Sequence, residues 1–229
     1  IGENVKIGPF CHIGSSTVLG DNSLIHSNVV IQGRTEIGSN TEVFPFASIG
    51  HAPQDLKFRG ENSVLRIGNN NKIREYVTMS PGTEGGGMVT TVGDNCLFMV
   101  GAHVAHDCHV GNNIIMANNA TLAGHVILGD FAIIGGLSAV HQFVRIGHHA
   151  MVGGMTGVEF DVIPFGQVQG DRAHLSGLNL IGLKRSSFSK EKINRLRAAY
   201  RMLFADEGTA KERVKDVAET FGQEPAVME

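Results

Sequence analysis

An apolar residue recurs at every sixth position through most of this chain. The first series runs Ile1, Ile7, Ile13, Leu19, Ile25, Ile31, Ile37, Val43, Ile49. After an irregular stretch the spacing resumes at Ile67, and a series shifted by one residue continues from Val92 to Val158. A repeat of six residues is too short for any repeat built of α-helices. It predicts a parallel β-helix, in which each short strand turns a corner and three strands close one coil of eighteen residues.

Asparagine supports the eighteen-residue coil independently. Asn4, Asn22 and Asn40 lie eighteen residues apart, and Asn95 and Asn113 repeat the offset after the phase shift. Asn tolerates a left-handed backbone better than any residue except Gly. We therefore expect a left-handed turn at one corner of each triangular coil.

The repeat divides the chain into two domains. We expect a β-helix over residues 1–170 and a helical domain over residues 171–229. Two segments interrupt the hexads, residues 51–63 and the glycine-rich residues 80–91. Insertions leave a solenoid at a corner and project from one face, which is often the binding face.

The sequence of the C-terminal domain predicts helices. Ser189 is a plausible N-cap for a helix through Phe204, and Gly208 follows it. Thr209 and Glu212 form the pattern of a capping box for a second helix, which Gly222 would close. We expect these helices to cover the C-terminal end of the β-helix.

Composition narrows the classes of function. A net charge of −3 and the lack of Trp give no sign of nucleic-acid binding. Three cysteines without metal-type spacing favour the reducing cytoplasm, and no run of eighteen apolar residues is present to span a membrane. The chain begins inside a repeat and without Met, so we expect coils to be missing before Ile1.

Basic residues gather after the repeats. Residues 172–201 hold eight basic side chains and one acidic one. A local basic patch of this kind is typical of contact with an acidic partner or a phosphate-bearing substrate, although a solvated helix face gives the same pattern.

Histidines fall where successive coils overlay. Eighteen residues beyond His106 lies Gly124, and eighteen further lies Gln142, while His125 and His141 are their neighbours. With His103 three residues upstream, four histidines should meet at one edge of the prism. The apolar hexad residues point into the core and not to this edge. Because four histidines meet there, the alternative that they are unrelated surface residues is a weak explanation.

Such a cluster suits two chemistries. Three neutral imidazoles, from His103, His106 and His125, can bind a metal ion. Alternatively, His106 can act as a general base, oriented by Asp107, with the Gly124 N–H beside it to stabilise an oxyanion. Nothing in the sequence marks Cys108 as an activated nucleophile.

Three segments carry a resemblance to a known family. The run HVAHDCHVGNNIIMANNATLAGHV (103–126), with DLK (55–57) before it and IIGGLSAVHQF (133–143) after it, closely resembles the acyl-carrier-protein-dependent UDP-N-acetylglucosamine O-acyltransferases of lipid A biosynthesis. The resemblance extends to GLKR (182–185) and covers nearly the whole chain. It implies a left-handed parallel β-helix, a homotrimer with active sites between subunits, and no cofactor or catalytic metal.

The resemblance also implies roles for particular residues. His106 is the implied general base, Asp107 its support, and Gly124 the source of the oxyanion-stabilising amide. Residues expected to line the substrate cleft are Asp55, Lys57, His103, His125, His141 and Gln142. Asn179 and Arg185 match positions that contact the nucleotide, and Gly154 matches the position whose size limits the acyl pocket.

One position departs from the family. Ser80 stands where familiar members carry a His near the sugar nucleotide, which leaves the choice between a 3-hydroxyl and a 3-amino sugar open. Acyl length is open as well. An acetyl-CoA-dependent hexapeptide acetyltransferase, a γ-class zinc carbonic anhydrase and a non-catalytic hexapeptide scaffold are the alternatives.

Overall fold

The computed structural model describes all 229 residues, as two compact units, Ile1–Ser176 and Gly177–Glu229. The end of the repeat had predicted a domain boundary between residues 170 and 171. The difference arises because β25 (His174–Leu178) adds a last strand to a sheet of the β-helix beyond the final hexad.

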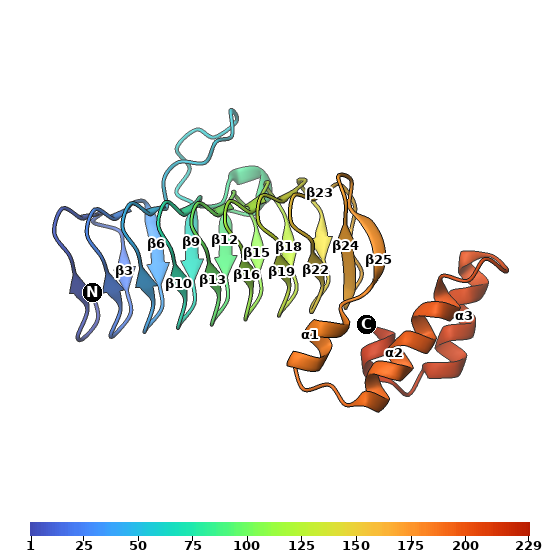
Figure 1. Cartoon of the computed structure of the whole chain (residues 1–229). Coiled ribbons are helices and arrows are strands. Elements are labelled where there is room, and N and C mark those ends of the chain that lie inside the picture. Colours follow the sequence, from blue (N-terminus) through green and yellow to red (C-terminus); the bar gives the residue numbers. More distant parts are fainter. The chain divides into compact units, whose positions relative to one another are not determined.

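The first unit is a left-handed parallel β-helix, whose coils stack one after another (Figure 1). Its strands form three sheets, one along each face of a triangular prism. The ten-stranded sheet contains β1 (Lys6–Ile7), β4 (Leu24–Ile25), β7 (Glu42–Val43), β10 (Lys72–Ile73), β13 (Leu97–Phe98), β16 (Ile115–Met116), β19 (Ile133–Ile134), β22 (Met151–Val152), β24 (Gly166–Gln169) and β25. The eight-stranded sheet contains β2 (His12–Ile13), β5 (Val30–Ile31), β8 (Ser48–Ile49), β11 (Thr78–Met79), β14 (His103–Val104), β17 (Thr121–Leu122), β20 (Ala139–Val140) and β23 (Gly157–Val158). The seven-stranded sheet contains β3 (Val18–Leu19), β6 (Arg34–Ile37), β9 (Val64–Ile67), β12 (Val89–Val92), β15 (His109–Val110), β18 (Ile127–Leu128) and β21 (Arg145–Ile146).

The strand register confirms the eighteen-residue coil. Lys6 pairs with Leu24, and His103 pairs with Thr121, each in parallel. The offset lengthens only across the two interruptions of the repeat, because Glu42 pairs with Lys72 and Lys72 with Leu97. The hexads therefore continue in register through both insertions.

The apolar hexad residues stack inside the prism. Ile25, Ile31 and Ile73 are fully buried, and one continuous cluster of buried apolar residues runs from Leu19 to Val168. Burying each such side chain stabilises the fold by about 1.5–3 kcal/mol. Since strand spacing fixes the rise at about 4.8 Å per coil, residues at equivalent positions of successive coils lie directly over one another.

Three edges join the three sheets. The asparagine edge links the seven- to the ten-stranded sheet and holds Asn22, Asn40 and Asn113. The third edge links the ten- to the eight-stranded sheet, and the histidine edge links the eight- to the seven-stranded sheet through residues such as 105–108, 123–126 and 141–144.

The predicted left-handed turns are confirmed at the asparagine edge, where Asn4, Asn22 and Asn40 have φ between 56° and 59°. The other two edges use the same turn with other residues, Tyr76 at the third edge and Asp107, His125 and Phe143 at the histidine edge among them. A bulky residue with positive φ is strained by itself. Stacking between neighbouring rings, such as Phe46 on Tyr76 with centroids 5.2 Å apart, offsets that strain.

Both insertions occupy the histidine edge. One joins β8 to β9 and the other joins β11 to β12, the connections that Ala105–Cys108 makes from β14 to β15 in the next coil. Figure 1 shows both segments leaving the prism along the same side. The second contains the 3₁₀ turn η1 (Glu84–Gly86). Backbone N–H groups near its carboxylate, first that of Glu61 itself and then including those of Arg59 and Glu84, lower the pKa of Glu61. The Glu61 carboxylate of the first insertion therefore lies near the second insertion.

The second unit is helical. It contains α1 (Leu180–Arg185), α2 (Lys190–Leu203), α3 (Ala210–Phe221) and α4 (Pro225–Met228). The predicted caps are confirmed: the Ser189 side chain accepts from the Lys192 N–H, and Thr209 and Glu212 form a complete capping box. The sequence analysis missed α1 and α4, which are too short to show a helical period. No helix in the molecule combines the length and the apolar character that crossing a bilayer requires.

Candidate functional site

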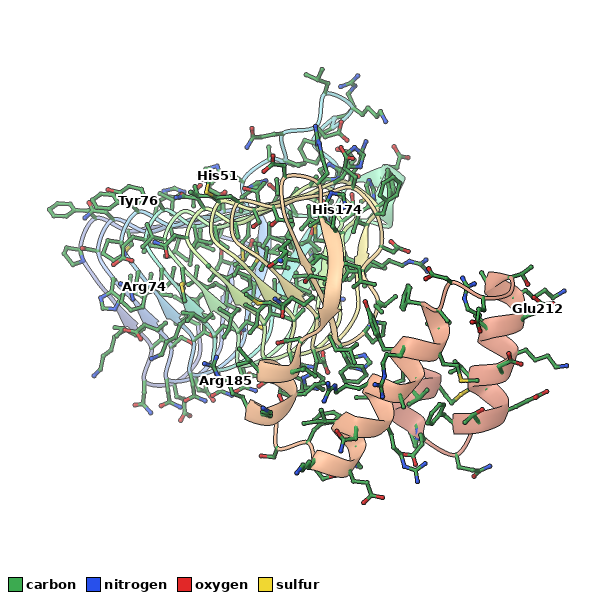
Figure 2. All side chains as sticks on the ribbon, turned by 45° about the vertical axis from the view of Figure 1, so that its right-hand side comes forward. His51, Arg74, Tyr76, His174, Arg185 and Glu212 are labelled. Atoms are coloured by element: carbon green, nitrogen blue, oxygen red, sulfur yellow. The ribbon has the colours of Figure 1, made fainter.

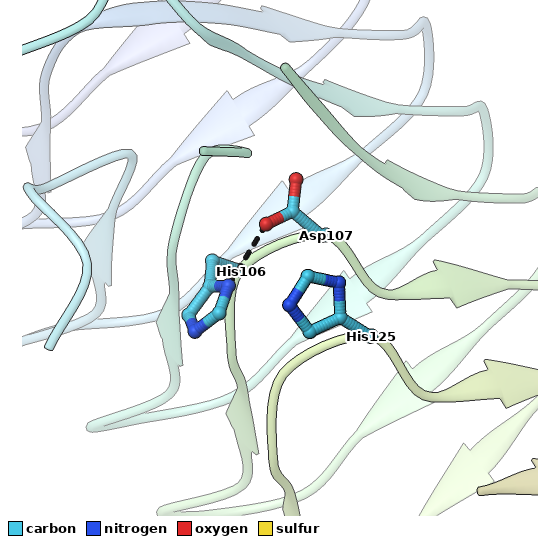
Figure 3. A group of neighbouring side chains, drawn as sticks. All are labelled: His106, Asp107 and His125. Carbon is cyan, nitrogen blue, oxygen red and sulfur yellow. Dashed lines mark hydrogen bonds and ion pairs between the residues drawn. The ribbon is translucent and has the colours of Figure 1, made fainter. Parts of the chain in front are cut away.

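The site is built on the histidine edge where β14 ends. Asp107 takes the left-handed conformation at this corner, with φ of 59°, so its side chain does not point opposite to that of its neighbour as it would in a straight strand. The carboxylate instead turns back to the ring of His106, and the His106 Nδ1 lies 2.8 Å from the Asp107 Oδ2 (Figure 3).

Asp107 is a fully buried carboxylate with three donors around it. Its Oδ1 accepts the Thr83 N–H at 2.9 Å, and its Oδ2 accepts the Thr83 hydroxyl at 2.6 Å as well as the His106 ring. An ionised carboxylate only accepts hydrogen bonds, so the His106 proton resides on Nδ1 and leaves the Nε2 lone pair free. This is the tautomer that a general base requires.

Gly124 lies against the ring of His106. An added Cβ at this position would come within 2.5 Å of the His106 Cε1, so only glycine fits beneath the imidazole. The Gly124 carbonyl accepts the Phe143 N–H, whereas the Gly124 N–H makes no hydrogen bond within the chain. The edge thus presents a basic nitrogen and a free amide proton side by side.

His125 completes this group. Its ring lies edge-on to that of His106, with centroids 5.0 Å apart, and stacks on Phe143 at 4.4 Å. Burial is the main cause that lowers the pKa of His125, and the charges of His106 and Lys57 act in the same direction, whereas those of Asp107 and Asp55 oppose it. His125 therefore favours the neutral form at neutral pH.

His103 lies on the neighbouring sheet face, not on the edge itself. Its Nδ1 is 2.7 Å from the Thr78 hydroxyl, one coil earlier. Burial, followed by the proximity of His106, lowers the pKa of His103. His103 is thus close enough to His106 to be felt electrostatically.

The remaining expected cleft residues of this unit have different positions. His141 and Gln142 begin the same corner one coil beyond Gly124, and the His141 Nδ1 lies 3.2 Å from the Gln142 carbonyl. Asp55 and Lys57 lie in the first insertion, where the Lys57 N–H donates to the Asp55 carboxylate, and both charges reach His125. All four lie at the histidine edge or on the insertion that leaves it.

Gly154 occupies a different edge of the prism, and two further expected residues belong to the second unit. Gly154 lies on the third edge, above Gly136. In the second unit, Asn179 is the N-cap of α1. Arg185, labelled in Figure 2, is the last residue of the same helix.

The arrangement fits a zinc site of three histidines poorly. The atoms that could bind a metal ion and lie within 4.8 Å of one another belong to His106, Asp107 and His125. His103 is not in this group. Both oxygens of Asp107 already accept hydrogen bonds from Thr83 or His106. A γ-class carbonic anhydrase site requires three imidazoles facing one ion.

Cys108 is not a nucleophile in this geometry. The thiol is fully buried and donates to the Ala123 carbonyl at 3.1 Å. Burial raises the pKa of Cys108 to about 12, so the reactive thiolate does not form at neutral pH.

The sequence analysis missed two residues that hold the site. Thr83 donates twice to Asp107, and the Thr90 hydroxyl accepts the Asp107 N–H at 2.7 Å. Thr83 lies 24 residues before Asp107, across an insertion that breaks the eighteen-residue overlay, so the repeat could not reveal it. Thr90 lies 17 residues before Asp107 and gave no signal beyond its place in a strand.

Comparison with known proteins assigns the architecture to a class of enzymes. Residues 1–33 and 90–124 match the model of bacterial transferase hexapeptide repeats, and residues 161–229 match the second domain of UDP-N-acetylglucosamine O-acyltransferases. The β-helix is thus that of a hexapeptide-repeat acyltransferase.

Relatives narrow the class to one family. The acyl-[acyl-carrier-protein]–UDP-N-acetylglucosamine O-acyltransferase of Bartonella henselae is 49% identical over 229 residues, which cover 100% of this chain and 84% of that protein. The enzyme of the same name from Rickettsia canadensis is 54% identical, over 100% of this chain and 87% of that protein. A crystal structure of UDP-N-acetylglucosamine O-acyltransferase from Moraxella catarrhalis superimposes with a TM-score of 0.95 at 39% identity, covering 98% of this chain and 88% of the other.

This chain belongs to the acyl-[acyl-carrier-protein]–UDP-N-acetylglucosamine O-acyltransferase family, and it is an acyltransferase.

Proposed function

We propose that this enzyme transfers a 3-hydroxyacyl chain from acyl carrier protein to the 3-position of UDP-N-acetylglucosamine, the first step of lipid A biosynthesis. The names of its relatives support both substrates. The observation that carries the mechanism is the pairing of the His106 imidazole, held by Asp107, with the free N–H of Gly124.

The reaction uses these two groups directly. The His106 Nε2 takes the proton of the sugar 3-hydroxyl as its oxygen attacks the thioester carbonyl. The Gly124 N–H donates to the oxyanion of the tetrahedral intermediate. The carbon–sulfur bond then breaks, and the thiolate of the carrier takes up the proton from His106. No acyl-enzyme forms, which agrees with a buried and protonated Cys108.

The other polar residues of the edge serve to hold the sugar nucleotide. His125, with its lowered pKa, is a neutral hydrogen-bonding group beside the base. His103 lies beside His106, Lys57 and Asp55 lie on the first insertion, and His141 and Gln142 extend the edge by one coil. Asn179 and Arg185 would contact the nucleotide from the second unit.

The distribution of residues over two edges favours a homotrimer. His106 lies on the histidine edge, whereas Gly154 lies on the third edge of the same prism. One sheet separates these edges, and six residues of extended chain span up to about 20 Å. A base and an acyl pocket placed so far apart in one chain can share a site when the histidine edge of one subunit faces the third edge of another.

The acyl pocket is open at Gly154. An added Cβ there would meet only backbone atoms of Gly136, its oxygen at 3.3 Å and its nitrogen at 4.0 Å, so neither residue fills the surface with a side chain. We therefore propose that a long acyl chain is the natural substrate, in preference to an acetyl group.

The basic segment, residues 172–201, is the proposed contact for acyl carrier protein. Opposite charge on the two partners speeds association and loses strength as salt screens it. With three free cysteines and a carrier protein as donor, we place the enzyme in the cytoplasm.

Ser80 is the position at which the acceptor atom is chosen. Its side chain is buried at the end of β11, one coil before Ala105, and its backbone N–H donates to the Val104 carbonyl. A small hydroxyl here leaves more room than an imidazole does. We propose that Ser80 relaxes or changes the preference between a 3-hydroxyl and a 3-amino sugar.

A competition assay tests the function. The enzyme is given UDP-N-acetylglucosamine, its 3-amino analogue, acetyl-CoA and a mixed pool of 3-hydroxyacyl carrier proteins, and the products are identified by mass spectrometry. We expect a long-chain 3-O- or 3-N-acyl product. Exclusive acetylation would indicate an acetyltransferase, and a strong preference for the hydroxyl would contradict the role given to Ser80.

A further inference from the structure

We propose that Thr83, on the second insertion, is a positioning residue that sets the basicity of His106 through Asp107. The inference rests on the proposed function, in which His106 is the general base. It assigns a chemical task to a loop that interrupts the repeat.

Thr83 donates a hydrogen bond to each oxygen of the Asp107 carboxylate. Its N–H donates to Oδ1 at 2.9 Å and its hydroxyl donates to Oδ2 at 2.6 Å. The second oxygen is the one that accepts the His106 Nδ1–H. Two donors thus share one oxygen, so a change in one bond changes the charge available to the other.

The insertion is shaped to make this contact. The Thr83 carbonyl accepts the N–H groups of Gly86 and Met88, at 3.1 and 2.9 Å, which closes the loop into a tight turn. An added Cβ on Gly86 would overlap the carboxyl carbon of Asp107, and one on Gly82 would come within 2.8 Å of its Oδ1. Glycine at these positions lets the backbone close over the carboxylate, and Thr83 itself is buried.

No Lys or Arg side chain forms a hydrogen bond with Asp107, whose donors are Thr83 and His106. The ionisable groups that face the pair are His103 and His125, both with lowered pKa, the buried thiol of Cys108, and beyond His125 the opposite charges of Asp55 and Lys57. The two bonds from Thr83 therefore carry most of the stabilisation of the carboxylate that His106 does not supply.

The Thr83 hydroxyl draws charge away from Oδ2, which keeps the protonated imidazole from becoming too stable. Without this hydroxyl, Oδ2 would hold the His106 proton more strongly and favour imidazolium. His106 would then become protonated, and so unable to act as a base, at a higher pH. It would also release its proton to the leaving thiolate less readily.

Two variants of Thr83 in the full chain test this role. In Thr83→Val the bond to Oδ2 is removed while the backbone bond to Oδ1 remains. We expect kcat to fall roughly tenfold, as for loss of one hydrogen bond to a charged group, and the acid limb of the pH profile of kcat/KM to move upward. Thr83→Ser keeps the hydroxyl and should restore both the rate and the profile.

Thr90→Val is the matched control. Thr90 touches the same residue, but its hydroxyl bonds the Asp107 N–H and not the carboxylate. Loss of this acceptor should lower the melting temperature, and any fall in rate should be uniform across the pH range. Equal pH profiles for Thr83→Val and the wild type, or equal shifts for Thr83→Val and Thr90→Val, would overturn the inference.

A readout without turnover separates the two proposals. The NMR titration of the His106 ring, identified by its loss in His106→Ala, should move to higher pH in Thr83→Val and return in Thr83→Ser. An unchanged titration overturns the role of Thr83 whatever reaction the wild type catalyses. Lack of acyl transfer by the wild type, with the NMR shift present, overturns the proposed function and leaves the link between Thr83, Asp107 and His106 intact.

Discussion

The asparagine edge and the histidine edge of one prism show how a single repeat serves two purposes. At the asparagine edge, side-chain oxygens form a ladder along the coils: Asp130 accepts the Asn112 N–H, Asn112 that of Asp94, and Asp94 that of Asn69. At the histidine edge the same turn presents Asp107 and His125, and the preceding coils carry insertions.

The difference lies in which polar groups are satisfied by the next coil. Along the asparagine edge, each oxygen of the ladder bonds a backbone N–H one coil away, and the edge continues without interruption. At the histidine edge Gly124 keeps a free N–H and His106 a free Nε2. One edge therefore stabilises the prism, and the other keeps hydrogen-bonding groups free.

The largest expected effect is on the histidine edge. His106→Ala removes the proposed base, and turnover should fall by at least roughly a hundredfold, the usual contribution of general-base catalysis. The side chain is partly exposed and outside the apolar core, so the melting temperature should change little. A near-normal rate of product formation in this variant would contradict the assignment.

Gly124→Ala tests the close fit beneath the imidazole. The added methyl group would displace the ring of His106, and small misplacements of a catalytic group cost about 10–100-fold in rate. Gly111→Ala, at the asparagine edge, provides the comparison, because its methyl group would clash with Asp130. We expect the first variant to lose kcat while remaining folded and the second to lose stability, and a reversed pattern would contradict the division between the edges.

Asp130→Ala breaks one rung of the ladder. The Asp130 Oδ1 accepts both the N–H and the side-chain amide of Asn112, at 2.7 and 3.2 Å. Loss of these bonds should lower the free energy of unfolding by about 1–2 kcal/mol, measured by urea denaturation. Activity at a temperature where the variant is folded should equal that of the wild type.

How much of this could be predicted from the sequence differs between the same two regions. The hexads and the spaced Asn residues predicted the coils and the asparagine edge, because both depend on a fixed period. The eighteen-residue period also predicted that His106, Gly124 and His125 lie close together. Thr83 was out of reach, because its contact with Asp107 depends on the conformation of a non-repeating loop.

The placement of Gly154 on another edge was not foreseen either. The resemblance implied a role for it without stating which face of the prism it occupies, and the repeat alone does not say which edges meet in an assembly. Bulky residues in left-handed turns, such as Tyr76, also gave no signal, because the stacking that stabilises them joins coils.

Cys108→Ala should have a small effect. The thiol is buried, and its pKa of about 12 keeps it protonated, so the rate should stay within about twofold of the wild type. Alkylating reagents should leave Cys108 unmodified in the folded protein, as shown by peptide mass spectrometry. Rapid alkylation with parallel loss of activity would restore a thiol mechanism to consideration.

The smallest effect concerns pH. Burial, with His106 nearby, lowers the pKa of His103 below its ordinary value in the unfolded chain. The unfolded state therefore binds more protons as the pH falls below about 6.5, so the free energy of unfolding decreases in that direction. His103→Gln should make the stability less dependent on pH between 7 and 5, and an unchanged slope in urea denaturation would contradict the lowered pKa.

The most direct test of the central claim is a crystal structure of the enzyme with UDP-N-acetylglucosamine bound. We predict that the sugar 3-oxygen lies about 2.6–3.2 Å from the His106 Nε2, with the Gly124 N–H facing the space where the thioester carbonyl will lie. A sugar bound at the asparagine edge, or with its 3-oxygen out of contact with His106, would contradict the account.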